Sequence, residues 1–498
     1  MSFDPMVIWQ GLASIMNPFT LLLMVFGVLC GIIIGVIPGL SATMAVALLI
    51  PFTFNMSAEL AMSLLVVVYV GGLSGGCITA ILIRMPGTPA SVATILDGFP
   101  MNKQGKGGQA IGNAVVASLF GTMISGIFLV IMAPILAEIA LKFFYAEYFS
   151  VSLFAMCAVV AISGKSIFRG LVTCGLGLLV STFGMSQVDG SIRFTLGIDG
   201  LSAGFNLIPS LIGLFAISQI MKEISSAEVN INYSKKIGRV LPTLSAIRQN
   251  IVNYLRSGLI GTFVGILPAV GGTPAAYMAY AQAKNASKKP ELFGKGSVEG
   301  VIASETANNA TIGGALIIAL TLGIPGDPPT AILIGGLMIH GLQPGPLLFT
   351  LTPEIIYSIY FSVFFGSLVM AAIMLFAAKP LARVVAIPKH NLFPVLFIVA
   401  VVGVFALNNR VFDVFVMCGF GVLGYILDRY EYPLPPMVLG IILGPLLEEN
   451  FRQLIETDGN AMGLITRPIS IFFLVMSVLF FAFSLYKHIK KLKSSALG

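Results

Sequence analysis

The sequence predicts an all-α, multi-pass membrane protein made of two inverted-topology repeats with re-entrant or Gly/Pro-broken helical hairpins. Composition supports the membrane assignment, because 57% of the 498 residues are hydrophobic, 10% are charged and the mean hydropathy is +0.97. A soluble domain is normally about a quarter charged. The repeats are predicted from a pair of Gly/Pro motifs that occurs in both halves, with the charges around it exchanged.

The first half contains two breaks between apolar segments. Residues 19–37 and 41–54 are separated by Pro38-Gly39, where a helix is interrupted because proline has no N–H donor. Residues 60–83 make a full span, and a second break at Pro86-Gly87 precedes a short apolar piece. The first segment has about the 20 residues of a span, so both a hairpin over 19–54 and a full span are open. Further spans are expected near 109–141, 146–163, 167–185 and 205–221.

The second half repeats these motifs after a polar, basic segment. Gly31, Gly35 and Pro38 match Gly261, Gly265 and Pro268, and Pro86-Gly87 matches Pro325-Gly326. We therefore expect a first transmembrane repeat at 1–221, a cytoplasmic linker at 222–256 and a second transmembrane repeat at 257–498. Its spans are expected near 353–378, 391–408, 411–428 and 434–448, with an extra C-terminal helix at 468–486 and a basic cytoplasmic tail.

Basic residues indicate opposite orientations for the two repeats. The loop between the two motifs lacks Lys and Arg in the first half (55–59) and carries four Lys in the second (284–295). The loop after the second motif shows the reverse pattern, with Lys103 and Lys106 in the first half and no charge at 341–346. Cytoplasmic loops collect basic residues. A threading with the N-terminus outside leaves few of the 28 Lys and Arg outside, namely Lys142, Arg193, Arg410, Arg452 and Arg467.

Polar residues precede the break in the second half. Glu305, Asn308 and Asn309 share one face of a helix by their spacing, and Asp327 follows the break. Such groups at membrane depth are costly unless they line a cavity or bind a ligand. We predict that all four couple transport to a cation, with Na⁺ at Asn308 and Asn309, whose amide oxygens suit a hard cation. Alternatively, Glu305 is a structural acceptor, and the stretch is a cytoplasmic helix start followed by a kinked span.

The helices that restart after each break are predicted to bind an anion. Their first N–H groups lack partners and carry partial positive charge. The predicted substrate-binding residues are Pro38, Gly39, Ser41, Thr43, Gly87, Thr88, Ser91, Gly272, Thr273, Gly326 and Thr330. Capping of the restarting helices is an equally good explanation for the hydroxyl groups. Asp97, at the end of the short apolar piece, is predicted to be structural.

Several other functions are excluded by missing motifs. The chain has no Walker A or His-Glu-x-x-His motif, so neither ATP drive within the chain nor zinc-dependent hydrolase activity is expected. Its five cysteines and three histidines are dispersed and show no metal-ligand spacing. A passive or gated anion channel stays open as an alternative to a transporter, because broken helices also build channel filters.

Five segments in order resemble the large membrane subunit of tripartite tricarboxylate transporters, the TctA-type permease. They lie at 35–54, 86–100, 265–273, 300–327 and 338–346. The resemblance implies a bacterial inner-membrane permease that imports citrate-like carboxylates by Na⁺ or H⁺ symport without another cofactor. It also implies a small TctB-type membrane subunit and a periplasmic TctC-type solute-binding protein as partners. The chain departs from the family pattern at Arg84, Ala269, Gly271 and Asp327, which leaves the particular carboxylate open.

Overall fold

The computed structural model describes residues 9, 11, 13, 15–162, 166–186, 188–225, 238–384 and 389–496. Residues 226–237 of the predicted linker and most side chains of the basic tail lie outside that part. The chain forms two compact units, one of Met1–Ala137 with Gln219–Gly403 and one of Glu138–Ser218 with Val404–Gly498. Each unit draws on both halves of the sequence. The predicted division at 222–256 concerns repeats rather than compact units, and it remains a prediction.

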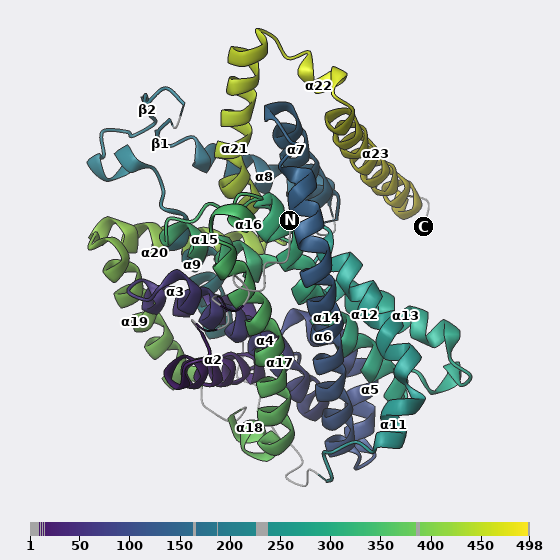
Figure 1. The fold of residues 1–498 in the computed structure, drawn as a ribbon. Coiled ribbons are helices and arrows are strands. Elements are labelled where there is room, and N and C mark those ends of the chain that lie inside the picture. Colours follow the sequence, from purple (N-terminus) through teal and green to yellow (C-terminus); the bar gives the residue numbers. More distant parts are fainter. Residues whose placement is uncertain are drawn as a thin grey trace. The chain divides into compact units, whose positions relative to one another are not determined.

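The first unit contains the helices around the four breaks (Figure 1). From the first half come α2 (Pro18–Val36), α3 (Ala42–Thr53), α4 (Ala58–Ile83), the 3-10 turn η1 (Pro89–Ser91), α5 (Val92–Lys103) and α6 (Gly107–Ala140). After α10 (Ser218–Ser225) come α11 (Leu244–Gln249), α12 (Ile251–Ile266), α13 (Gly272–Ala286), η4 (Pro290–Leu292), α14 (Val298–Leu322), α15 (Pro328–Ile339), α16 (Leu348–Leu351), α17 (Pro353–Phe376), α18 (Ala378–Val384) and α19 (Lys389–Asn408).

Polar caps explain where several of these helices begin. The Asn17 side chain accepts from the Thr20 N–H at 2.9 Å, and the Ser297 hydroxyl accepts from the Gly300 N–H at 3.3 Å. Such contacts satisfy N–H groups that have no carbonyl partner in the first turn. At the other end, α4 and α14 stop at residues in the left-handed conformation, Arg84 (φ 61°) and Gly323 (φ 68°).

The same order of elements occurs twice in the first unit. In the first half, α2 packs against α4, and in the second half α12 packs against α14. Gly31 and Gly35 of α2 lie directly against backbone carbonyls of α4, and Gly261 and Gly265 of α12 lie in the same way against α14. A Cβ at any of these positions would meet the opposing backbone. The two GxxxG motifs therefore bring each helix pair into close contact, as small residues do in membranes.

The second break of each half lies against the helix pair of that half. A Cβ on Gly87 would meet the Gly35 carbonyl and the backbone of Gly76, and a Cβ on Gly326 would meet the Gly265 carbonyl and Ala315. Only glycine fits at these two contacts without displacing backbone. The matched Pro-Gly sequences thus occupy matched places.

Nine helices of the described residues are long and apolar enough to cross a membrane. The prediction of a helical protein with several membrane spans is confirmed, whereas the inverted orientation of the repeats stays a prediction. By length and composition α2 is among the nine, with 19 residues, whereas α3 has 12. The span expected near 167–185 is shorter than predicted, because its helix ends at Ser181 and a strand follows. The helix expected over 434–448 continues to Asp458.

The second unit contains α7 (Tyr145–Ile162), α8 (Ile167–Ser181), η2 (Asp199–Ala203), α9 (Leu207–Ile212), the π-helical stretch η3 (Gly213–Ile217), α20 (Val411–Arg429), α21 (Leu434–Asp458), α22 (Gly463–Thr466) and α23 (Pro468–Ala496). Between α8 and α9, two residues of β1 (Gly184–Met185) pair antiparallel with two of β2 (Ile192–Arg193). The sequence analysis did not predict this hairpin, which is too short to show a strand periodicity.

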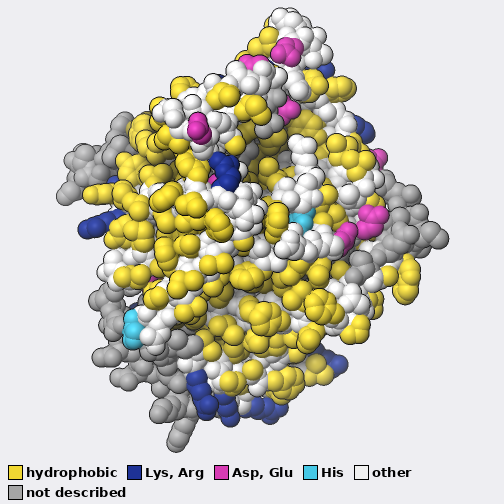
Figure 2. Space-filling view, turned by 90° about the vertical axis from the view of Figure 1, so that its left-hand side faces the viewer, with side chains coloured by type: hydrophobic (Ala, Val, Ile, Leu, Met, Phe, Trp, Pro, Cys, Tyr) yellow, Lys and Arg dark blue, Asp and Glu magenta, His cyan; other side chains and the backbone are white. Residues whose placement is uncertain are grey.

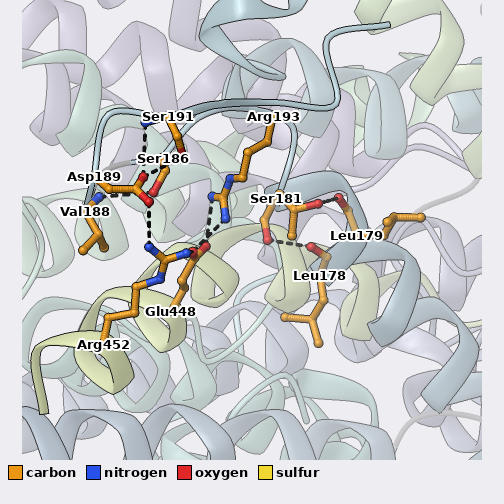
Figure 3. Close-up of polar contacts among 11 residues, drawn as sticks. Leu178, Leu179, Ser181, Ser186, Val188, Asp189, Ser191, Arg193, Glu448 and Arg452 are labelled. Carbon is orange, nitrogen blue, oxygen red and sulfur yellow. Dashed lines mark hydrogen bonds and ion pairs between the residues drawn. The ribbon is translucent and has the colours of Figure 1, made fainter. Parts of the chain in front are cut away.

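Ion pairs hold the β1–β2 loop against the polar end of α21 (Figure 3). Arg193 donates to both carboxylate oxygens of Glu448, at 2.7 and 3.0 Å. Arg452 bridges Glu448 and Asp189 at 2.9 and 3.0 Å. Hydrogen bonds from Ser191 and Ser186, together with Arg452, hold the pKa of Asp189 below its usual range. A bidentate arginine in a network of this kind orders a loop better than isolated surface pairs do.

Hydrophobic side chains cover much of the face shown in Figure 2. On α23 the exposed residues include Phe472, Val478 and Phe483, each more than half exposed. Such a surface is expected where helices meet lipid. Together with the nine long apolar helices, it is consistent with a multi-pass membrane protein.

Candidate functional site

Helix α14 is the centre of the candidate site. Every residue from Gly300 to Thr321 is buried, although the stretch contains a carboxylate and two carboxamides. Figure 1 shows α12, α13 and α14 side by side, and α14 also packs against α4, α5 and η1. The polar face of α14 is therefore enclosed by elements of both halves of the sequence.

Asp97 of α5 is hydrogen-bonded to the backbone of the loop that precedes α14. One of its carboxylate oxygens accepts from the backbone N–H groups of Gly294, Gly296 and Ser297, each at 2.8 Å. The other accepts from the Tyr280 hydroxyl at 2.8 Å. Asp97 thus uses both oxygens in structural hydrogen bonds, in line with the role expected from the sequence.

Glu305 and Asn309 form one buried hydrogen-bonded cluster with hydroxyls of the first half. The Thr94 hydroxyl donates to one Glu305 oxygen, and the Ser118 hydroxyl lies 3.4 Å from the other. The Asn309 amide donates to Ser118 at 2.8 Å, and its oxygen accepts from Ser74 at 2.6 Å. Among the described residues no ion pair reaches Glu305. The cluster ties α14 to α4, α5 and α6.

Asn308 has different surroundings from its neighbour. It is fully buried, yet neither polar atom of its side chain has a hydrogen-bond partner in the described part of the chain. Its amide oxygen lies beside Gly272, the first residue of α13, and a Cβ on Gly272 would also meet Ala90 of η1. The Asn308 Oδ1 therefore faces the starts of α13 and η1, while the Asn308 side chain also lies close to the Glu305 carboxylate.

Asp327 caps the helix that follows the second break of the second half. Its carboxylate accepts from the Thr330 N–H at 3.0 Å, and the Thr330 hydroxyl lies 3.0 Å from the Asp327 N–H, which makes a capping box at the start of α15. The Tyr69 hydroxyl of α4 donates to the other Asp327 oxygen. In the first half, Thr88 and Ser91 occupy the matching positions, and their hydroxyls are 3.1 Å apart.

The remaining predicted substrate residues lie at the first break of each half. The Ser41 hydroxyl caps α3 by accepting from the Met44 N–H at 3.2 Å. Gly39, which follows Pro38, has a φ of 90° and accepts at its carbonyl from the Gln219 side chain. Thr43 is buried in the first turn of α3. Thr273 is half-buried in the first turn of α13.

Two junctions bring the predicted residues of the two halves together. At the first junction, the start of η1 and α5 packs against α13 and α14, so Thr88 and Ser91 share a neighbourhood with Gly272 and Asn308. At the second junction, the start of α15 packs against α3 and α4. Gly326 and Thr330 therefore belong to a different place from Gly272 and Thr273.

Four polar partners of the site were not predicted from the sequence, namely Tyr69, Ser74, Thr94 and Ser118. They lie singly among small and apolar residues, which give no local signal of a site. One signal was available, because Tyr69 has the same place relative to Pro86-Gly87 as Asn308 has relative to Pro325-Gly326. Aligning the repeats would have marked that position.

Comparisons with known proteins agree with the resemblance seen in the sequence. The model of the tripartite tricarboxylate transporter TctA family matches residues 21–439. An Agrobacterium vitis protein, described as an uncharacterized 52.8 kDa protein in the TAR-I ttuC' 3' region, is 34% identical over 464 residues, covering 92% of both chains. A second A. vitis protein, from the TAR-II ttuC' 3' region, is 38% identical over 211 residues, which are 42% of this chain and 87% of that protein.

No solved structure matches the chain. The family match spans most of the chain, including all four Gly/Pro breaks and the whole of α14. The family is one of transporters and not of enzymes. The chain therefore belongs to the tripartite tricarboxylate transporter TctA family.

Proposed function

We propose that this chain is the permease of a secondary active transport system that imports carboxylates across the bacterial inner membrane. In this proposal a TctC-type periplasmic protein delivers the substrate, a TctB-type subunit accompanies the permease, and a cation gradient drives uptake. Membership of a tripartite tricarboxylate transporter family supports the class of substrate and the two partners. The buried polar face of α14 supports coupling to a cation.

The observation that carries the proposal is the environment of Glu305. A buried carboxylate without a basic partner is costly in its charged form, so it binds a proton or a cation. The Thr94 and Ser118 hydroxyls contact Glu305, and the Asn309 amide nitrogen lies 3.4 Å from it. The carboxylate and the two hydroxyls supply oxygen ligands, which suit a hard cation such as Na⁺. Because Glu305 contacts helices of both halves, loading and unloading it would change how the halves pack. We therefore assign the coupling site to Glu305 and Asn309.

The starts of the broken helices supply the substrate side. After Gly39, Gly87, Gly272 and Gly326, helical segments begin whose first N–H groups suit a carboxylate. We propose that the two halves, 1–221 and 257–498, are inverted repeats and that alternate opening of their junctions moves the substrate. Discontinuous helices at a repeat interface are typical of such transporters.

Uptake by reconstituted protein tests the proposal. Proteoliposomes containing the permease and its small subunit are given the periplasmic protein and labelled citrate, malate or succinate, with an imposed Na⁺ or pH gradient. We expect saturable, receptor-dependent uptake and counterflow. The Glu305→Gln variant should lose at least tenfold of gradient-driven uptake, because glutamine can neither release a proton nor balance the charge of a cation. Its matched control is Glu299→Gln, in the first turn of the same helix, which should keep the wild-type response.

Each part of the proposal can fail separately. Absence of uptake of all three carboxylates by the complete wild-type system would contradict the function. Non-saturating flux without counterflow would identify an anion channel instead. Equal gradient dependence in the Glu305→Gln and Glu299→Gln proteins would remove Glu305 from the coupling site.

A further inference from the structure

The first junction contains a buried amide, that of Asn308, which has no hydrogen-bond partner among the described residues. We propose that Asn308 and the helix starts at the first junction bind the carboxylate group of the substrate, whereas the second junction is filled by the protein's own Asp327. This inference rests on the proposed function, because it locates the substrate site of that transporter. It also separates Asn308 from Asn309 in role.

The two junctions are built alike, which makes one a guide to the other. Tyr69 of α4 and Asn308 of α14 hold matching positions before the second break, and Thr88 and Asp327 hold matching positions directly after it. At the second junction, Tyr69 donates a hydrogen bond to the Asp327 carboxylate at the start of α15. The fold therefore already shows how one of these helix starts holds a carboxylate.

The first junction has an asparagine in place of the tyrosine and a threonine in place of the aspartate. Thr88 stands where the other half has Asp327, and it makes no side-chain cap to η1. Asn308 stands where the other half has Tyr69, and both polar atoms of its side chain are buried with no hydrogen-bond partner in the part of the chain that the structure describes. A buried amide without a partner costs free energy, and a ligand carboxylate would supply the missing acceptor.

The two junctions also differ in whether side chains cap their helix starts. At the second junction, Ser41 caps α3 and Asp327 caps α15, so the donors there are used. At the first junction, α13 begins after Gly271 without a side-chain cap, and η1 leads into α5 with no side-chain cap at Thr88 or Ser91. The starts of α13 and of η1 with α5, which lack side-chain caps, thus meet the Asn308 amide. Its Oδ1 lies at Gly272, and its N–H₂ comes to the same place when the amide turns about its last torsion. This is the donor set that a carboxylate requires.

Placing a carboxylate at position 88 tests the idea directly. In the Thr88→Asp variant the first junction would hold its own carboxylate, as the second does, and a substrate carboxylate would be excluded. We expect citrate uptake by the reconstituted system to fall at least tenfold, while the protein stays folded with an apparent Tm no lower than that of the wild type. The Asn308→Leu variant should bind citrate about tenfold more weakly through loss of one charged hydrogen bond.

A matched control lies two residues away on the same helix. Thr306 is fully buried, and its hydroxyl also has no hydrogen-bond partner among the described residues. Its backbone carbonyl lies beside Gly121 of α6, whereas the Asn308 side chain lies beside Gly272 of α13. Thr306→Val should therefore keep wild-type citrate affinity. If Asn308→Leu does not fold, Asn308→Asp is the alternative variant, because it keeps the shape of the side chain and places a negative charge beside the ligand. It should weaken citrate binding at least as much.

A double-mutant cycle measured by thermal unfolding separates failure of this inference from failure of the proposed function. Apparent Tm values of the wild type, Thr88→Asp, Asn308→Leu and the double variant need no transport. If Asn308 binds the new carboxylate, Thr88→Asp should change the Tm several degrees more favourably in the wild type than in the Asn308→Leu protein. Additive Tm effects, or wild-type uptake by Thr88→Asp, would overturn the site. Absence of carboxylate uptake by the wild type would instead contradict the function.

Discussion

Asn308 and Asn309 are neighbours in the sequence but have different roles in the fold. Successive residues of a helix point about 100° apart, so one amide turns toward α13 and the other toward α4 and α6. Both polar atoms of the Asn309 side chain are hydrogen-bonded, whereas those of Asn308 have no hydrogen-bond partner within the described ranges. The joint Na⁺ site predicted at these two residues is therefore replaced in our proposal by a coupling site at Asn309 and a substrate site at Asn308.

Ala269 provides a residue-scale prediction about stability. It has a φ of 50°, in the left-handed region that disfavours residues with a Cβ, and the matching residue of the first half is Gly39. Ala269→Gly should therefore raise stability by about 1 kcal/mol. The measurement is thermal unfolding in detergent. Ala275→Gly, in the buried interior of α13, serves as control and should lower the Tm, so an equal loss in both variants would contradict the argument.

At the scale of elements, the paired helices α2 with α4 and α12 with α14 organise the first unit. Their glycines bring backbones together, and dispersion between such surfaces is a main source of helix association in lipid. The Pro-Gly breaks then sit on these pairs, which positions η1 and α15 for the two junctions. The junctions consequently depend on the close packing of α4 and α14, which carry polar site residues, against α2 and α12.

Alanine at either GxxxG motif should separate these helix pairs. Gly35→Ala and Gly265→Ala each place a Cβ against an opposing backbone carbonyl, and we expect losses of about 1–3 kcal/mol from overpacking. Gly175 of α8 is the control, because its Cβ would meet nothing within 4 Å. Gly175→Ala should be neutral or stabilising. A stability of Gly265→Ala equal to that of Gly175→Ala, measured by thermal unfolding, would contradict the packing argument.

For the whole molecule, the first unit is built by exchange between the two halves of the sequence. The second break of each half packs against the first hairpin of the other, so neither half completes a junction alone. The chain alternates between the two compact units, which explains why their boundaries differ from those of the predicted repeats. Inverted orientation of the halves would expose the two junctions from opposite sides of the membrane.

Labelling from outside the cell tests that orientation. In a background without the native cysteines, Ser57→Cys and Lys289→Cys place thiols at exposed positions in the two loops between the motifs. The exchanged basic residues predict that an impermeant maleimide reaches position 57 and misses position 289. Both sites should react after membranes are opened, which controls for accessibility. Equal labelling in intact cells would contradict inverted repeats.

The sequence alone determined the family, the membrane class, most spans and the four breaks, because each of these depends on local chemistry or composition. Only the tertiary structure decided which polar groups meet. Helices α4 and α23 have similar hydropathies, 2.1 and 2.4, yet 94% of the first span is buried and 11% of the second. In lipid both the core and the surface are apolar, so hydrophobic patterning cannot show which face is inside. The partners of Glu305, the capping of α15 by Asp327 and the isolation of Asn308 follow from packing between distant segments.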